Sequence, residues 1–156
     1  MAASARNGKI LNKVKSCDGQ ELKEMFAAAT LWLEKSASAI DALNVFPVPD
    51  GDTGTNMLLT MRSSVEEAQR VSDKNASAVM QAMAHGALMG ARGNSGVILS
   101  QIIRGLARGL NGKTSFNVEG LATSLQEACG LAYKAISRPV EGTILTVLRE
   151  ATEAAQ

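Results

Sequence analysis

Hydrophobic residues recur at helical spacing along most of this chain. Between Leu22 and Leu33 they fall three or four positions apart, and the same spacing returns around Met80, Ile102 and Leu125. Such a period gives a helix one apolar face, whereas a half-buried strand alternates hydrophobic and polar residues. No alternating stretch is present in the sequence. The pattern therefore predicts an all-α fold.

Capping residues, glycines and prolines bound the expected helices. Asp18, Asn75 and Asn117 each precede an apolar periodic segment and suit the N-cap position. Arg138 and Pro139 end one segment, because proline disfavours helix in the residue before it. We expect a loose lead-in over 1–17, helices over about 18–43 and 54–71, and a helix that begins at Asn75 and carries Leu88. A glycine-rich connection over 86–96 follows, and then helices over about 97–109 or 112, 117–137 and 142–156.

One domain is expected after the lead-in. The sequence shows no internal repeat, low-complexity tract or linker, and 156 residues suit a single core. The last segment, 150–156, favours helix and contains no stop signal. We therefore expect residues 18–156 to form a domain that is truncated at its C-terminus, in a fragment of a longer chain; the alternative is a last helix that frays.

Composition agrees with this fold. Aromatic residues make up only 3% of the chain, and alanine, methionine and leucine, which favour helix, must fill the interior. A net charge of +1 gives no electrostatic reason to expect nucleic acid or a membrane surface as partner. Cys17 and Cys129 lie far apart, which indicates reduced thiols in a cytoplasmic protein, and no apolar run reaches the length of a membrane span.

Residues 44–57 carry the most specific pattern in the chain. Pro47 and Pro49 stiffen a loop, Asp50 and Asp52 follow one residue apart, and helical spacing resumes after Asn56. Carboxylates are ligands that Mg²⁺ prefers, and a helix N-terminus attracts phosphate. The pattern predicts a metal–nucleotide site. The alternative is a surface turn, because aspartate and glycine are common turn residues.

A second candidate is the glycine-rich stretch at 86–96. Its glycines permit a close backbone approach, and Asn94 or Ser95 can cap the next helix and so create another anion site. It is not a Walker loop, since no lysine followed by serine or threonine comes after the glycines. The alternative is close packing of helices through glycine. Arg92 suits a phosphate, or more simply a nearby carboxylate.

The third candidate is the turn at 138–144. Taken alone it is a helix–helix connection with a solvated Glu141. In an up-and-down bundle, however, the three loops fall at alternate helix junctions and share one end, where bundles can hold cofactors. His85, the only histidine, is interpreted as structural or capping, and no GxSxG nucleophile motif occurs.

Residues 44–57, 86–101 and 139–144 together resemble the N-terminal nucleotide-binding domain of the bacterial fatty acid kinases, in the dihydroxyacetone kinase family. The similarity runs from about Asp18 to the end of the chain. It implies a DhaL-like barrel of antiparallel amphipathic helices that binds ATP at one end. It also implies a pair of Mg²⁺ ions that bridge the phosphates to loop acids.

The resemblance assigns the site residue by residue. Asp50 and Asp52 match the metal-binding acids, and Asn44 could add a neutral oxygen where the family's kinases carry a further acid. The remaining positions match segments that contact the phosphates or border the base; they are Thr53, Gly54, Thr55, Asn56, Asn94, Ser95, Gly96, Thr143 and Ile144.

The implied reaction transfers the γ-phosphoryl group of ATP to a fatty acid carboxylate. The acid is presented by a DegV-family carrier protein. This chain is shorter than the family's barrel and lacks the later domains of the fatty acid kinases, so we expect catalysis to depend on the remaining kinase domains. Two alternatives stay open. One is a kinase for a small molecule such as dihydroxyacetone (glycerone), and the other is a nucleotide-binding module without turnover.

Overall fold

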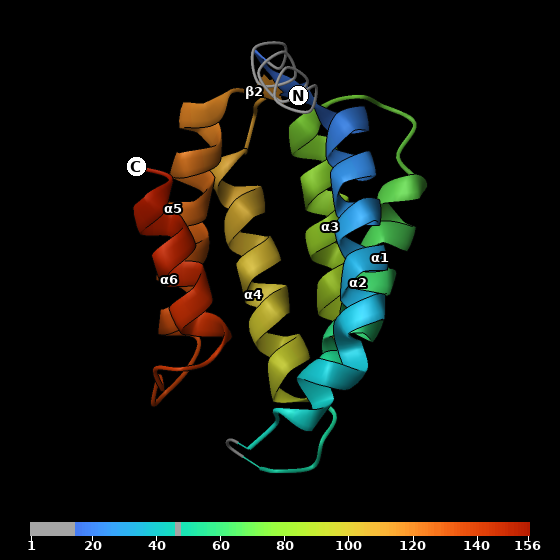
Figure 1. The fold of residues 1–156 in the computed structure, drawn as a ribbon. Coiled ribbons are helices and arrows are strands. Elements are labelled where there is room, and N and C mark those ends of the chain that lie inside the picture. Colours follow the sequence, from blue (N-terminus) through green and yellow to red (C-terminus); the bar gives the residue numbers. More distant parts are fainter. Residues whose placement is uncertain (1–14, 46–47) are drawn as a thin grey trace, which may run out of the picture.

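A computed structural model of the chain describes residues 15–45 and 48–156. In this part, helices run alternately up and down, and a small antiparallel sheet joins two segments at one end (Figure 1). The elements are β1 (Cys17–Asp18), α1 (Gly19–Ala42), α2 (Thr53–Gln69), α3 (Ala76–Met89), α4 (Gly93–Gly109), β2 (Ser115–Phe116), α5 (Val118–Lys134) and α6 (Ile144–Ala154). The all-α prediction is confirmed, and the arrangement is consistent with a DhaL-like bundle.

The two strands were not predicted. Each contains two residues, and β1 pairs with β2 through Cys17 opposite Phe116. Two residues are too few to show an alternating pattern, so this pairing depends on tertiary contacts, among them those of β2 with α3 and α5. Any helical tendency of the lead-in around Ile10, Leu11 and Val14 lies outside the described residues.

The predicted N-caps are confirmed. Asp18 Oδ1 accepts from the backbone N–H groups of Gln20 (2.8 Å) and Glu21 (3.0 Å), and the Glu21 carboxylate accepts from the Asp18 N–H (2.9 Å), which completes a capping box. Asn75 caps α3 and Asn117 caps α5 by accepting one backbone N–H each, from Ala78 and Gly120 (both 3.0 Å). Each cap contributes about 1 kcal/mol to helix stability.

The glycine-rich connection is shorter than predicted. Because α3 continues to Met89 and α4 begins at Gly93, only residues 90–92 connect them, and Gly86 and Gly96 lie inside helices. A Cβ at Gly86 would lie 2.4 Å from the Ser63 carbonyl oxygen, and one at Gly96 would lie 2.4 Å from Thr60 Oγ1. Both glycines therefore let a helix approach α2 closely, as the packing interpretation proposed.

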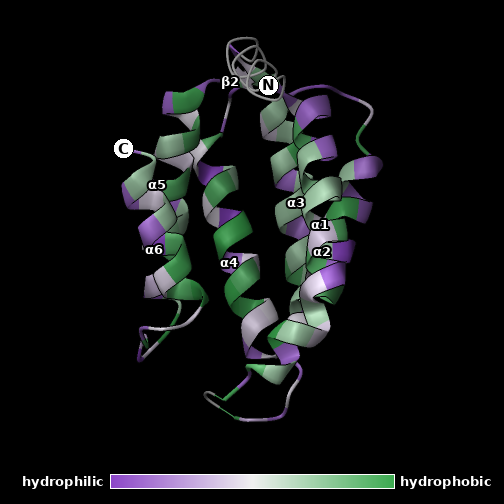
Figure 2. Cartoon of the chain, viewed as in Figure 1, coloured by the Kyte–Doolittle hydropathy of each residue, from purple (hydrophilic) through white to green (hydrophobic). Residues whose placement is uncertain are grey.

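Two hydrophobic clusters form the core, and α4 contributes to both. It places Ile103 in the larger cluster, with α1, α2 and α3, and Ile102 in the smaller one, with α5 and α6. Figure 2 accordingly shows α4 as hydrophobic along much of its length. Helical spacing also predicts Met25 and Leu88 on the inward faces of their helices, and this is wrong, since they are 50% and 55% exposed.

The direction of the helices brings the three candidate loops to one end. Helices α1, α3 and α5 run toward it, and α2, α4 and α6 run back (Figure 1). We call it the loop end; it carries residues 43–45, 48–52, 90–92 and 135–143, while the opposite sheet end carries β1 and β2. The predicted sharing of one end is confirmed. None of the helices described here combines the length and the apolar character needed to cross a membrane.

Candidate functional site

The N-terminus of α2 is capped from another helix. Asp52 occupies the N-cap position, yet its side chain makes no capping hydrogen bond. Asp41, in the last turn of α1, instead accepts from the Thr55 backbone N–H (3.0 Å) and from Thr55 Oγ1 (2.7 Å). The hydroxyl of Thr55, and then the N–H groups of Thr55 and Gly54, hold the pKa of Asp41 below its usual range.

Sequence reasoning missed Asp41. It precedes Thr55 by 14 positions, so no local spacing rule joins the two residues. The usable signal is weaker: Asp41 lies in the last turn before the loop, where an acid does not complement the helix dipole. An acid so placed needs a partner elsewhere.

The loop before α2 is fixed by Asn44. Its Nδ2 donates to the Val48 carbonyl (2.6 Å) and to Asp50 Oδ1 (3.3 Å), and its Oδ1 accepts from the Thr53 hydroxyl. The structure thus brings Asn44, Asp50 and Thr53 together. Asp50 is exposed and Asp52 is half-buried, so both carboxylates can reach a ligand at the loop end. The stiffening expected from Pro47 lies outside the described residues.

The N-terminus of α4 adjoins that of α2. Gly93 begins α4 with a φ of +57°, and a Cβ there would lie 2.4 Å from Asn56 Nδ2, so only glycine fits. Ser95 Oγ lies 3.4 Å from the Thr53 carbonyl oxygen, to which it donates. The first turns of the two helices are therefore in direct contact.

The predicted cap of α4 is wrong. Arg92 occupies the N-cap position without a side-chain bond, and Asn94 and Ser95 lie in the first turn instead. The positive φ of Gly93 starts the helix earlier than a capping rule places it. Since no side chain caps this helix, its first N–H groups point toward the loop end, where an anion could accept from them.

The third loop is held by Glu141. Its carboxylate accepts from the Tyr133 hydroxyl (2.9 Å), from Thr146 Oγ1 (2.7 Å) and from Arg149 (3.3 Å). Thr143 Oγ1 donates to the Val140 carbonyl (2.8 Å) and accepts from the Leu145 N–H (3.3 Å), so Thr143 caps α6. Glu141 is exposed to solvent, as expected for a helix–helix connection, and its hydrogen bonds also order the turn around it.

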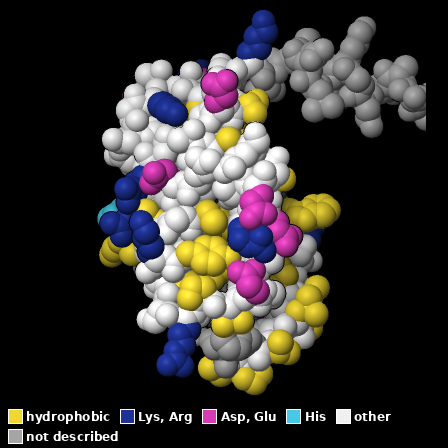
Figure 3. Space-filling view, turned by 90° about the vertical axis from the view of Figure 1, so that its left-hand side faces the viewer, with side chains coloured by type: hydrophobic (Ala, Val, Ile, Leu, Met, Phe, Trp, Pro, Cys, Tyr) yellow, Lys and Arg dark blue, Asp and Glu magenta, His cyan; other side chains and the backbone are white. Residues whose placement is uncertain are grey.

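On the α5–α6 face of the molecule, basic groups stand among acidic ones beside exposed apolar side chains (Figure 3). Arg149, on α6, has Glu141, Glu150 and Glu153 within 4.0 Å of its guanidinium. Among the described residues, no hydrogen bond or ion pair joins 135–143 to the other two loops. This loop shares their end of the bundle while standing on the far side of α4.

Tyr133 reports on this network, because it is the only tyrosine in the chain. Burial first, and then the hydrogen bond to Glu141 and its charge, raise the pKa of Tyr133 above its ordinary value. We expect Glu141→Gln to lower the pKa of Tyr133 toward that value without reaching it, since burial remains. An ultraviolet titration of the phenolate measures the pKa of Tyr133 in the wild type and in Glu141→Gln. An unchanged pKa would contradict the contact.

The same contacts hold the pKa of Glu141 below its usual range, with the Thr146 hydroxyl as the largest cause. The carboxylate therefore contributes stability at pH values above its unfolded pKa, and this contribution is lost as the pH falls through the lowered folded-state pKa. Ordering of the 135–143 loop is expected to weaken in that acidic range.

Two other residues have different surroundings from those expected. His85 is exposed in the middle of α3, so it neither fills the core nor caps a helix. Arg92 is exposed, and no carboxylate of the described residues lies within 4.0 Å of it, so the carboxylate expected as its simpler partner is not found there. Its backbone N–H donates to Thr60 Oγ1 (3.3 Å), which ties the short connection to α2.

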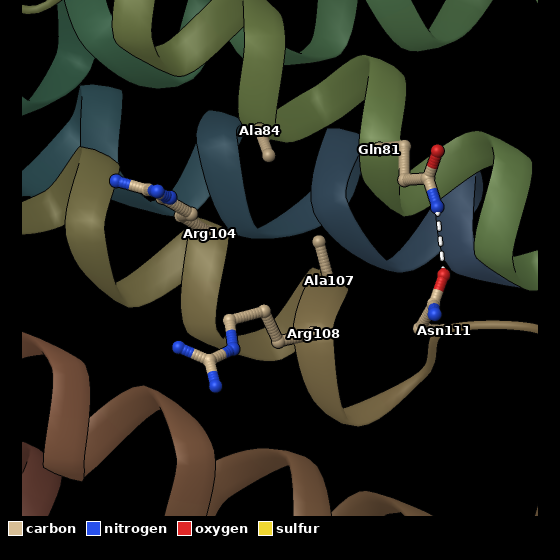
Figure 4. A pocket seen from close by; sticks show the side chains of 6 residues that line it. All are labelled: Gln81, Ala84, Arg104, Ala107, Arg108 and Asn111. Atoms are coloured by element: carbon tan, nitrogen blue, oxygen red, sulfur yellow. Dashed lines mark hydrogen bonds between the residues drawn. The ribbon is translucent and has the colours of Figure 1, made fainter.

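A cavity of about 330 Å³ between α3 and α4 lies apart from these loops (Figure 4). Its wall includes Gln81, whose Nε2 donates to Asn111 Oδ1 (3.0 Å), and the exposed side chains of Arg104 and Arg108. Asn111 follows α4 at the sheet end. None of the predicted site residues lines this cavity, and it is not part of the candidate site.

The donor set at the loop end suits a metal that arrives with phosphate. Among the described residues, no group of three or more histidine, cysteine, aspartate or glutamate side chains could hold a metal by itself. Asp50, Asp52 and Asn44 offer two carboxylates and one amide. Magnesium is usually bound by one or two carboxylates, with water and substrate phosphates completing its shell. These residues fit that mode of binding.

The sequence is similar to a known domain family and to bacterial proteins. The family model described as the DAK2 domain matches residues 47–156. Protein YloV of Bacillus subtilis (strain 168) is 49% identical over 142 residues, which cover 91% of this chain and 26% of that protein. An uncharacterized protein of Staphylococcus aureus (strain USA300) is 46% identical over 142 residues with the same coverage. The chain thus spans about a quarter of the length of these relatives.

Proposed function

The chain belongs to the DAK2 domain family, part of the dihydroxyacetone kinase family, and on this premise we propose that it binds Mg-ATP at its loop end. The observation that carries the proposal is the contact between the first turns of α2 and α4. Two helix N-termini meet there, next to Asp50 and Asp52. Helix N-termini favour phosphate, and carboxylates favour the magnesium that accompanies it.

Each candidate residue has a role in this proposal. Asp50 and Asp52, with Asn44, hold two magnesium ions, which when bound neutralise charge on the phosphates. Residues 53–56, in the first turn of α2, and residues 94–96 of α4 line the phosphates, and the Thr55 N–H, which is donated to Asp41, is not among the phosphate donors. Thr143 and Ile144 border the base. The chain contributes mainly by fixing the triphosphate in one orientation, which is most of what phosphoryl transfer requires.

The finer proposal is a fatty acid kinase. A carboxylate oxygen of a fatty acid attacks the γ-phosphorus of ATP, the bond from that phosphorus to the ADP oxygen breaks, and the products are an acyl phosphate and ADP. The fatty acid is presented by a DegV-family carrier protein, and domains beyond this chain complete the enzyme. Support comes from the resemblance of residues 44–57, 86–101 and 139–144.

Isothermal titration with ATP, with and without Mg²⁺, tests the first proposal. We expect binding that strengthens markedly when Mg²⁺ is present. ATP that fails to bind, or binds equally in EDTA, would contradict the site. Transfer of labelled γ-phosphate is then assayed with the full-length protein, in separate reactions with a fatty-acid-loaded carrier and with dihydroxyacetone. Label in the acyl phosphate supports the fatty acid kinase, label in dihydroxyacetone phosphate the glycerone-type kinase, and binding without transfer a non-catalytic module.

A further inference from the structure

Two aspartates lie near the N-terminus of α2, and they differ in what they bind. Asp41 uses both carboxylate oxygens on Thr55, Oδ1 for the backbone N–H and Oδ2 for the hydroxyl. Asp52 occupies the N-cap position and caps nothing. We propose that Asp41 is a positioning residue, which caps α2 from α1 and so leaves the Asp52 carboxylate for magnesium. This inference rests on the proposed function.

The backbone explains why Asp52 is not the cap. An N-cap aspartate normally adopts an extended conformation and accepts from the second or third N–H of its helix. Asp18, the N-cap of α1, does so with a ψ of −177°, whereas Asp52 has a ψ of 8°. The third N–H of α2 belongs to Thr55 and is already donated to Asp41. Since one N–H makes one good hydrogen bond, Asp52 is left without this acceptor role.

Packing of α1 against α2 allows Asp41, in place of Asp52, to cap α2. Gly54 lies against α1 so closely that a Cβ would be 2.3 Å from the Ala37 carbonyl oxygen. Asp41 follows Ala37 by one helical turn and therefore lies on the same face of α1, next to the start of α2. The cap thus depends on a crossing between two helices, and it ties the end of α1 to the loop end.

Without Asp41, capping of α2 and binding of magnesium should compete for the Asp52 carboxylate. In Asp41→Ala the Thr55 N–H loses its acceptor, and Asp52 is the N-cap acid available to replace it. A helix cap is worth about 1 kcal/mol, so we expect Mg-dependent ATP affinity to fall about five- to tenfold. Asp41→Asn should restore it, because an asparagine oxygen still accepts from Thr55 and caps a helix equally well.

The test measures ATP affinity as a function of Mg²⁺ concentration in wild type, Asp41→Ala and Asp41→Asn. Asn117→Ala is the matched control, since it removes the cap of α5 at the sheet end, where Asn117 Oδ1 accepts from Gly120 N–H at 3.0 Å. We expect only Asp41→Ala to need more Mg²⁺. Equal Mg²⁺ dependence in Asp41→Ala and Asn117→Ala would overturn the inference. Wild type without Mg-ATP binding would instead overturn the proposed function.

A second measurement uses the wild-type chain and does not depend on how the variants fold. Carboxyl ¹³C resonances of the aspartates are followed by NMR while Mg²⁺ and a non-hydrolysable ATP analogue are added. We expect the Asp52 resonance to move and the Asp41 resonance to stay, with the Thr55 amide protected from exchange throughout. If the Asp41 resonance moves as a ligand's does and the Thr55 amide loses its protection, Asp41 is not the cap and the inference fails.

Discussion

Replacing Asp52 with alanine is expected to abolish Mg-dependent ATP binding while leaving the helical content of the chain unchanged. Outer-shell changes at metal sites typically cost 10- to 100-fold in affinity, and losing a direct carboxylate ligand should cost more than about 100-fold. Because the Asp52 side chain caps no helix, its removal should not lower the free energy of unfolding. Isothermal titration and circular dichroism measure the two effects separately.

Asp73→Ala is the control for this prediction. Asp73 lies in the connection between α2 and α3 at the opposite end of the bundle, where its Oδ1 accepts from the Asn75 N–H (3.0 Å). Losing that acid should leave ATP affinity as it is. Retained Mg-dependent affinity in Asp52→Ala, with normal helicity, would count against Asp52 as a ligand.

Gly54→Ala is expected to lower the free energy of unfolding by about 3 kcal/mol. The added Cβ would meet backbone atoms of α1, at 2.3 Å from the Ala37 carbonyl oxygen and 2.8 Å from the Ala37 Cα. Backbone cannot rotate aside as a side chain can, so α2 must move away from α1 at its first turn. That movement separates Thr55 from Asp41 and should weaken Mg-ATP binding as well. Urea unfolding and titration measure the two losses.

Two other glycines provide controls for Gly54→Ala. Gly130 has no atom within 4 Å of an added Cβ, so Gly130→Ala in α5 should stabilise the chain by about 0.5–1 kcal/mol. Gly105→Ala would place a Cβ 2.3 Å from the Ala128 Cα, which should destabilise the chain where α4 crosses α5. If all three variants bound Mg-ATP equally well, the α1–α2 crossing would have no part in positioning the site.

Local patterns were sufficient for most of the helices. The starts of α1, α3 and α5 follow from Asp18, Asn75 and Asn117, since a cap satisfies N–H groups within three residues of itself. Positions that fill the core, such as Val79 and Met83, follow from helical spacing. Gly86 and Gly96 were wrongly placed in the connection between helices. Glycine is common both in turns and at close contacts between helices, and only the presence of a neighbouring helix distinguishes these two cases.

The class of fold and the common end of the three candidate loops follow from the sequence alone, because helical periodicity and short connections leave an up-and-down arrangement. Which side chain satisfies which helix terminus depends instead on how the helices pack. Asp41, on α1, accepts the Thr55 N–H that an N-cap residue such as Asp52 would normally accept. Gly93, which lies close to Asn56, begins α4 two residues before Ser95. Both outcomes depend on contacts between segments that are distant in the chain, and the spacing of neighbouring residues in the sequence cannot predict such contacts.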